Sequence, residues 1–153
     1  MKAIVIGAGH IGCGLVGQLL RAAGYQVVFV VNSPILADHF NRVGRYRVRL
    51  VNGPEAQEIV VDEVRAVSSI DPDQVAAEIG SADLITTSVG ASNLPMVAPL
   101  IASGLSQRSK PVNILAFENL SKAGSYLRNL ISWYLPADFP LAEYGFSTAL
   151  VNR

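Results

Sequence analysis

Short runs of β-branched and apolar residues alternate along this chain with longer amphipathic segments. The short runs are typical of buried strands, and the segments between them show the spacing of helices that cover a sheet. The pattern therefore predicts a parallel β-sheet with crossover helices. The predicted strands are residues 3–6, 27–31, 65–67, 84–87, 112–117 and 146–150, and the predicted helices are 11–23, 34–43, 72–79, 95–105 and 121–134.

One segment departs from this alternation. Residues 46–51 and 58–61 flank the turn signal Asn52-Gly53-Pro54, which predicts an antiparallel hairpin inserted at the edge of the sheet. Residues 135–140 contain two prolines and are interpreted as a rigid connection before the last strand, because no composition shift marks a domain boundary there.

Composition narrows the class of protein. The 153 residues suffice for one domain with a proper core, and with 50% hydrophobic and 16% charged residues the chain is not disordered. The formal net charge of +0 argues against a nucleic-acid partner. Glycines, prolines and polar residues interrupt both long charge-free stretches, residues 3–20 and 84–107, so we expect no membrane association. The single cysteine, Cys13, cannot form an internal disulfide, which favours a cytoplasmic location.

A glycine motif follows the first predicted strand and begins the first helix. Gly7, Gly9 and Gly12 form the pattern G-x-G-x-x-G. In this context the first glycine permits a tight turn, the second lets a pyrophosphate approach the backbone, and the third lets helix and strand pack closely. The free N–H groups of the new helix also favour an anion. The motif therefore predicts a dinucleotide site.

The end of the second strand leaves the choice of cofactor open. A carboxylate that would bind the ribose hydroxyls is expected about twenty positions after the glycines. Asn32 and Ser33 stand there instead. Asn32 can form hydrogen bonds with a ribose or a 2′-phosphate, whereas Ser33 is interpreted first as a helix cap and second as a ligand contact. NAD is expected, and NADP remains an alternative.

Two later strands also end in residues that suit a ligand. Ser88, Val89 and Gly90 follow the strand at 84–87, and we favour cofactor contact there over a simple strand-to-helix turn. Glu118 and Asn119 follow the strand at 112–117 and are predicted to face the nicotinamide end of the crevice. The alternative is that Asn119 or Ser121 caps the next helix.

Several other residues have side chains that could take part in chemistry. Arg45, Arg47 and Arg49 alternate in the hairpin and could reach a 2′-phosphate or a phosphorylated substrate, but a solvated edge that discourages strand pairing is favoured. Cys13 lies near a helix N-terminus, yet packing is favoured over a reactive thiolate. His10 and the second histidine lack metal-ligand spacing, so no metal site is predicted.

Taken together, these motifs resemble the nucleotide-binding half of the mannitol-1-phosphate 5-dehydrogenase and polyol dehydrogenase family. The resemblance covers essentially the whole chain and rests on residues 7–17, 88–90, 117–120 and 146–153. It implies an α/β fold with a doubly wound, mostly parallel Rossmann-type sheet, helices on both faces and a β-hairpin insertion. It also implies that residues 1–153 form one dinucleotide-binding domain. The family transfers a hydride between NAD(H) and a polyol or sugar phosphate without a metal.

The resemblance also implies roles for individual residues. The pyrophosphate would lie against Gly7, Gly9, His10, Ile11 and Gly12, and the cofactor would also contact Ser88, Val89 and Gly90. Glu118 occupies a position where the family has an acidic residue. Asn119 matches the asparagine whose amide supports the reacting oxygen of the substrate. The catalytic lysine, asparagine and histidine of the family belong to a C-terminal domain that is absent from this chain.

The chain departs from the family pattern at several positions. Cys13 replaces an arginine, Val31 replaces the ribose-binding aspartate, and Asn152-Arg153 stands where Asp-Arg is common. Two other functions therefore stay open: a dinucleotide-binding module without catalysis, and the nucleotide half of an enzyme like ketopantoate reductase. The pair Glu118-Asn119 argues against the latter.

Overall fold

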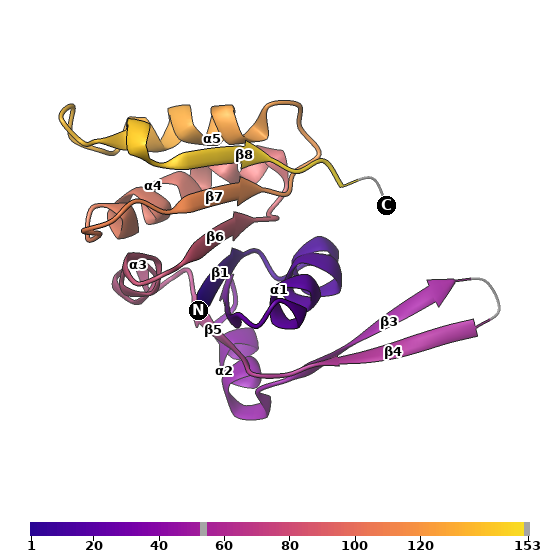
Figure 1. Cartoon of the computed structure of the whole chain (residues 1–153). Helices are drawn as coiled ribbons and strands as arrows, with labels where there is room; N and C mark the ends of the chain where they lie inside the picture. Colours follow the sequence, from indigo (N-terminus) through magenta and orange to yellow (C-terminus); the bar gives the residue numbers. More distant parts are fainter. Residues whose placement is uncertain (53–54, 152–153) are drawn as a thin grey trace.

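Six parallel strands form the central sheet, in the order β5-β2-β1-β6-β7-β8 (Figure 1). The computed structural model describes residues 1–52 and 55–151. The strands are β1 (Lys2–Ile6), β2 (Gln26–Val31), β5 (Val64–Ser68), β6 (Leu84–Thr87), β7 (Asn113–Ala116) and β8 (Gly145–Thr148). All six predicted strands are thus confirmed, with small shifts at their ends.

The strand order creates a switch point beside β1. The chain first builds outward from β1 through β2 to β5, and then crosses back to place β6 on the other side of β1. Connections leave the carboxyl ends of β1 and β6 in opposite directions, and in a doubly wound sheet this is where ligands bind.

Helices cover both faces of the sheet, as predicted. Ile4 and Ile6 of β1 point into the larger core cluster, with side chains from α3, α4 and α5. Ala3 and Val5 point into the other cluster, with side chains from α1 and α2. The helices are α1 (Gln18–Ala22), α2 (Pro34–Val43), α3 (Pro72–Gly80), α4 (Leu94–Leu105) and α5 (Ala123–Ser132), with short 3-10 turns η2 (Ala91–Asn93) and η3 (Leu141–Glu143). The predicted fold class is confirmed.

The first helix, predicted at residues 11–23, is present but changes type along its length. Its beginning, η1 (Gly12–Gly17), is π-helical, and regular α-helix follows only in α1. The hydroxyl of Tyr46, on the hairpin, donates a hydrogen bond of 2.8 Å to the carbonyl oxygen of Cys13. A side chain that bonds to a helical carbonyl in this way disturbs the regular ladder. The predicted helix is therefore confirmed, and the π-helical stretch within it depends on a contact with a distant part of the chain.

The inserted hairpin consists of β3 (Tyr46–Asn52) and β4 (Glu55–Val61), which pair antiparallel as predicted. It precedes the edge strand β5, but it forms a two-stranded sheet of its own and projects from the body of the molecule (Figure 1). Val48 and Val61 anchor its base in the core cluster that also contains Phe29. Gly53 and Pro54 of the predicted turn lie outside the described residues, as do Asn152 and Arg153.

Helix starts agree with the sequence in some places and not in others. Asp71 caps α3 by accepting a hydrogen bond of 3.1 Å from the backbone N–H of Gln74. By contrast, α5 begins after Lys122, whose φ is 60° and whose side chain makes no cap hydrogen bond. The hydroxyl of Thr148 on β8 instead accepts a hydrogen bond of 2.9 Å from the backbone N–H of Gly124 in the first turn. The alternative of a cap from Asn119 or Ser121 is therefore wrong.

Across the described ranges, no helix combines the length and apolar character that crossing a membrane would require.

Candidate functional site

The loop between β1 and the first helical turn is closely packed at two of its three glycines. Gly7 has φ +102°, and a Cβ there would lie 2.5 Å from the carbonyl oxygen of Ser88. A Cβ on Gly12 would overlap the carbonyl oxygen of Gly7. Gly9 differs, since no protein atom lies within 4 Å of the position that its Cβ would take. This open position is consistent with the approach of a pyrophosphate to the backbone.

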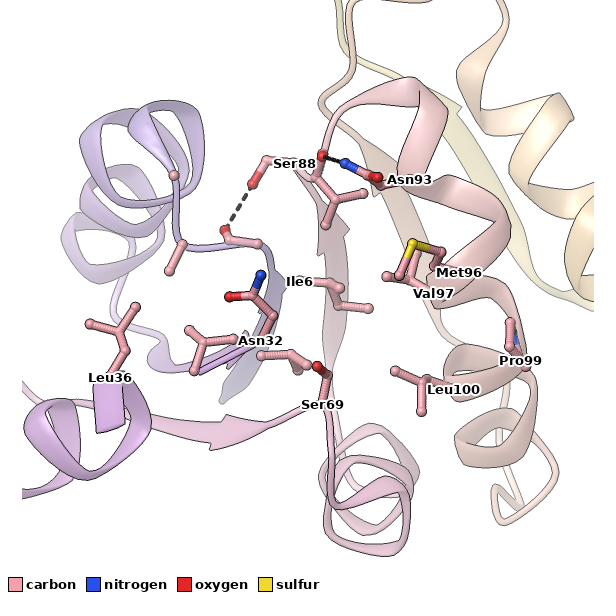
Figure 2. A pocket seen from close by; sticks show the side chains of 16 residues that line it. Ile6, Asn32, Leu36, Ser69, Ser88, Asn93, Met96, Val97, Pro99 and Leu100 are labelled. Carbon is pink, nitrogen blue, oxygen red and sulfur yellow. Dashed lines mark hydrogen bonds between the residues drawn. The ribbon is translucent and has the colours of Figure 1, made fainter. Parts of the chain in front are cut away.

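A cavity of about 650 Å³ lies at the carboxyl edge of the sheet (Figure 2). Volumes of roughly 300–1,000 Å³ are typical of small-molecule sites. The glycine loop and the end of β2 form one wall, and the turn after β6 together with α4 forms the other. Of the residues expected at a cofactor site, this cavity brings together Gly7, Gly9, Asn32, Ser88 and Val89. We call it the main crevice.

Sequence reasoning missed the α4 wall of the main crevice. Asn93, Met96, Val97 and Leu100 line it, and Figure 2 shows them opposite Asn32. Their spacing of three and four residues is that of one helical face. Met96 is 74% exposed despite being apolar, a combination that a sequence cannot reveal.

Asn32 and Ser33, at the end of β2, have different roles in the structure. Asn32 is exposed and lines the main crevice. The hydroxyl of Ser33 accepts a hydrogen bond of 3.3 Å from the backbone N–H of Leu36 and so caps α2. The first interpretation of Ser33, as a helix cap, is confirmed. Its contact with a cofactor stays a prediction.

The turn after β6 is fastened to the glycine loop. The Ser88 hydroxyl donates a hydrogen bond of 3.0 Å to the carbonyl oxygen of Gly7. On the other side of the turn, the side-chain amide of Asn93 donates to the carbonyl oxygen of Val89 at 2.7 Å. Gly90 has φ +87°, a conformation that favours glycine, and is exposed.

Glu118 supports this same turn from inside the protein. It is 3% exposed, and its two carboxylate oxygens accept hydrogen bonds from the backbone N–H groups of Val89 (2.9 Å) and Gly90 (2.8 Å). The carboxylate therefore connects the end of β7 to the end of β6. It does not line the main crevice. We expected it at the cofactor, but the contacts seen here are with the turn that borders the crevice.

Asn119 follows Glu118 and is exposed at the same edge of the sheet. It lines neither cavity that borders the glycine loop. The structure thus places it at the predicted edge but not in contact with the crevice. Its role at the substrate stays a prediction.

His10 and Ile11 line a second cavity, on the other side of the glycine loop. His10 is exposed. In the described part of the chain, no group of three or more His, Cys, Asp or Glu residues is arranged to hold a metal ion.

Cys13 also lines this second cavity, but its thiol is not activated as a nucleophile. Its thiol donates a hydrogen bond of 3.3 Å to the carbonyl oxygen of Ala8. Burial raises the pKa of the Cys13 thiol to about 11, so the group is neutral near pH 7. The packing interpretation is therefore favoured over a reactive thiolate.

The strand order, the glycine loop and the crevice at the switch point define a Rossmann-type, nucleotide-binding class of domain. The chain belongs to the mannitol dehydrogenase family: the family model described as the mannitol dehydrogenase Rossmann domain matches residues 1–153.

A sequence relative agrees with this assignment, and two solved structures share the fold. Mannitol-1-phosphate 5-dehydrogenase from Brevibacillus brevis is 39% identical over 160 residues, covering 100% of this chain and 41% of the relative. The chain thus spans less than half the length of that enzyme. Mannitol 2-dehydrogenase from Pseudomonas fluorescens, solved with NAD and D-mannitol, is similar in fold, with a TM-score of 0.79 at 12% identity over 95% of this chain and 40% of that one. A ketopantoate reductase from Ralstonia eutropha gives a TM-score of 0.57 at 24% identity, covering 88% of this chain and 38% of that one.

Proposed function

We propose that this chain is the cofactor-binding domain of an NAD-dependent dehydrogenase that acts on a polyol or a polyol phosphate. The substrate pair would be of the mannitol 1-phosphate and fructose 6-phosphate type. The observation that carries the proposal is the main crevice at the switch point, where Gly9 leaves room for a ligand against the backbone. The family membership and the mannitol-1-phosphate 5-dehydrogenase relative support the substrate class.

The residues of the crevice suit the parts of a dinucleotide. The backbone N–H groups beside Gly9 would hold the pyrophosphate, and Asn32 would form hydrogen bonds with the adenosine ribose. Ser88 and Val89 border the side of the crevice next to β6 and would lie against the nicotinamide half. When bound, NAD supplies the hydride acceptor for oxidation of an alcohol.

Asn119 would act at the edge of the crevice that faces the substrate. Its side-chain amide is a hydrogen-bond donor, and a donor there stabilises an oxygen on which negative charge develops. The proton-transferring groups would come from the part of the relative's length that the present sequence does not span. We therefore expect no oxidation of mannitol or mannitol 1-phosphate by this chain alone. Measurable turnover would show that the catalytic groups have been misplaced.

Titration with NADH, followed by nicotinamide fluorescence, tests cofactor binding. Gly9→Ala and Gly14→Ala form a matched pair, because an added Cβ meets no protein atom within 4 Å at either position. Only Gly9 lines the main crevice. We expect Gly9→Ala to weaken NADH binding at least tenfold, with Gly14→Ala close to the native chain. The absence of saturable NADH binding by the native chain would refute the proposal.

A further inference from the structure

Among the described residues, Glu118 is the only charged residue that is almost completely buried, at 3% exposed. Both of its carboxylate oxygens accept hydrogen bonds from backbone N–H groups, those of Val89 at 2.9 Å and Gly90 at 2.8 Å. No Lys, Arg or His of the described part of the chain forms an ion pair with it. The two N–H groups satisfy its hydrogen bonds but leave its charge uncompensated. Glu118 therefore places a net negative charge inside the protein.

Only the turn after β6 separates this carboxylate from the main crevice. The N–H group of Val89 bonds to Glu118, and Val89 also lines the crevice. The hydroxyl of Ser88 ties the same turn to the carbonyl oxygen of Gly7 in the glycine loop. The charge of Glu118 is therefore fixed behind the wall that was proposed to contact the nicotinamide half of the cofactor.

The crevice itself brings no formal charge to this wall. None of its described lining residues is an Asp, Glu, Lys, Arg or His, and most of them are apolar residues or glycines. A buried charge in such surroundings is screened far less than a charge at the surface. The beginning of α4, which follows the turn, opposes it with only about half a unit of positive charge. The wall next to β6 is therefore negative in sign.

The glycine loop gives the other side of the crevice the opposite sign. It begins a helix, and the free N–H groups at such a position carry partial positive charge, which suits a pyrophosphate. NAD⁺ has the matching pattern, with negative charges on its pyrophosphate and a positive charge on its nicotinamide ring. NADH has the same pyrophosphate, but its ring is neutral because it has accepted a hydride. Only the ring therefore distinguishes the two redox forms.

We propose that Glu118 makes the main crevice selective for the oxidised cofactor, because its buried charge attracts the positive ring of NAD⁺ and not the neutral ring of NADH. The inference rests on the proposed function, since it uses the position of the nicotinamide half beside Val89. Tighter binding of NAD⁺ lowers the midpoint potential of the bound couple, which favours reduction of a ketose over oxidation of a polyol. A tenfold change in the ratio of the two affinities corresponds to about 30 mV for a two-electron couple.

Calorimetric titration with NAD⁺ and with NADH separates this attraction from the support of the turn. We expect the native chain to bind NAD⁺ at least as tightly as NADH. Glu118→Gln keeps the shape of the side chain but removes its charge. It should weaken the binding of NAD⁺ about tenfold more than the binding of NADH, as expected for unit charges that attract through the protein interior.

Two further variants serve as matched controls, and circular dichroism verifies the fold of each. Ser88→Ala removes the bond to the carbonyl oxygen of Gly7 but leaves Glu118 charged, so any loss of affinity should be equal for NAD⁺ and NADH. Glu118→Asp keeps the charge on a shorter side chain. It should weaken both forms while retaining more of the preference for NAD⁺ than Glu118→Gln does.

Two outcomes would overturn the inference. If Glu118→Gln weakens both redox forms by the same factor, the carboxylate supports the turn without selecting the oxidised cofactor. A native chain that binds NADH more tightly than NAD⁺ would overturn it without any variant. Failure of the native chain to bind either form refutes the proposed function, whereas binding of both forms without an effect of the charge refutes only this inference.

Discussion

Replacing Glu118 with glutamine tests whether the buried carboxylate holds the turn after β6. In the native chain its two oxygens accept hydrogen bonds from the N–H groups of Val89 at 2.9 Å and Gly90 at 2.8 Å. Glutamine keeps one acceptor oxygen but turns an NH₂ group toward the second N–H. One backbone donor therefore loses its acceptor beside a side chain that is only 3% exposed.

The size of the effect follows from these two bonds. A hydrogen bond to a charged group contributes about 1.5–3 kcal/mol, and a buried donor left unsatisfied costs about 1–3 kcal/mol. Glutamine offsets part of this loss, because it removes a charge from the protein interior. We expect Glu118→Gln to lower the free energy of unfolding by about 2 kcal/mol. For a chain of this size, that corresponds to a decrease in Tm of roughly 4–8 °C.

Urea unfolding followed by circular dichroism measures this difference, and NADH titration of the same variant reports on the crevice. Glu143→Gln is the control, because it removes the same charge from an exposed position and should stay within about 0.5 kcal/mol of the native chain. We also expect Glu118→Gln to weaken NADH binding several-fold, since Val89 lines the crevice. If Glu118→Gln matches Glu143→Gln in both measurements, the carboxylate does not hold the turn.

Three further predictions concern other parts of the chain. Tyr46→Phe removes the hydrogen bond to the Cys13 carbonyl but keeps the ring, so the free energy of urea unfolding should fall by about 1 kcal/mol; an unchanged value would contradict the account of η1. Burial alone would raise the pKa of Glu78, but hydrogen bonds and charges from Arg65 and Lys2 hold that pKa below its usual value. The stabilisation is therefore complete above the pKa of an unfolded glutamate and is lost as the pH falls through the lower folded-state pKa. Unfolding free energies of the native chain and Glu78→Gln should accordingly converge on acidification, and a constant difference would disprove this. Burial raises the pKa of the Cys13 thiol to about 11, so iodoacetamide at pH 8 should alkylate Cys13 much more slowly than it alkylates the thiol of free glutathione. Equal alkylation rates for the two thiols would contradict the burial of Cys13.

Much of the fold could be predicted because it depends on local patterns. Apolar runs located all six strands of the sheet, and the serine before Pro34 identified the start of α2. The π-helical stretch could not be predicted, because it involves a bond between Cys13 and Tyr46, which lie 33 residues apart. The independence of the hairpin from the main sheet likewise depends on where β3 packs, which no turn signal encodes.

The same distinction applies to the candidate site, where positions set by the local sequence could be predicted and positions set by packing could not. Gly9 and Asn32 could be placed at the crevice because each lies within three residues of the end of a strand. The wall formed by α4 was missed, because an exposed apolar face and a buried one have the same helical spacing. Met96 illustrates this, since its accessibility depends on how α4 lies against the sheet.

Glu118 and Asn119 show how one strand end can serve two purposes. These two residues follow the end of β7, and Glu118 is buried whereas Asn119 is exposed. The buried carboxylate secures the turn that carries Ser88 and Val89, which leaves the following amide free at the outer edge. The position of Asn119 relative to the Ser88–Val89 wall of the main crevice therefore depends on Glu118, which itself lines neither cavity beside the glycine loop. If Asn119 has the proposed role at the substrate, the glutamine substitution should lower kcat more than cofactor affinity in a full-length relative that carries a glutamate at this position. Equal losses in both would indicate that the turn alone responds.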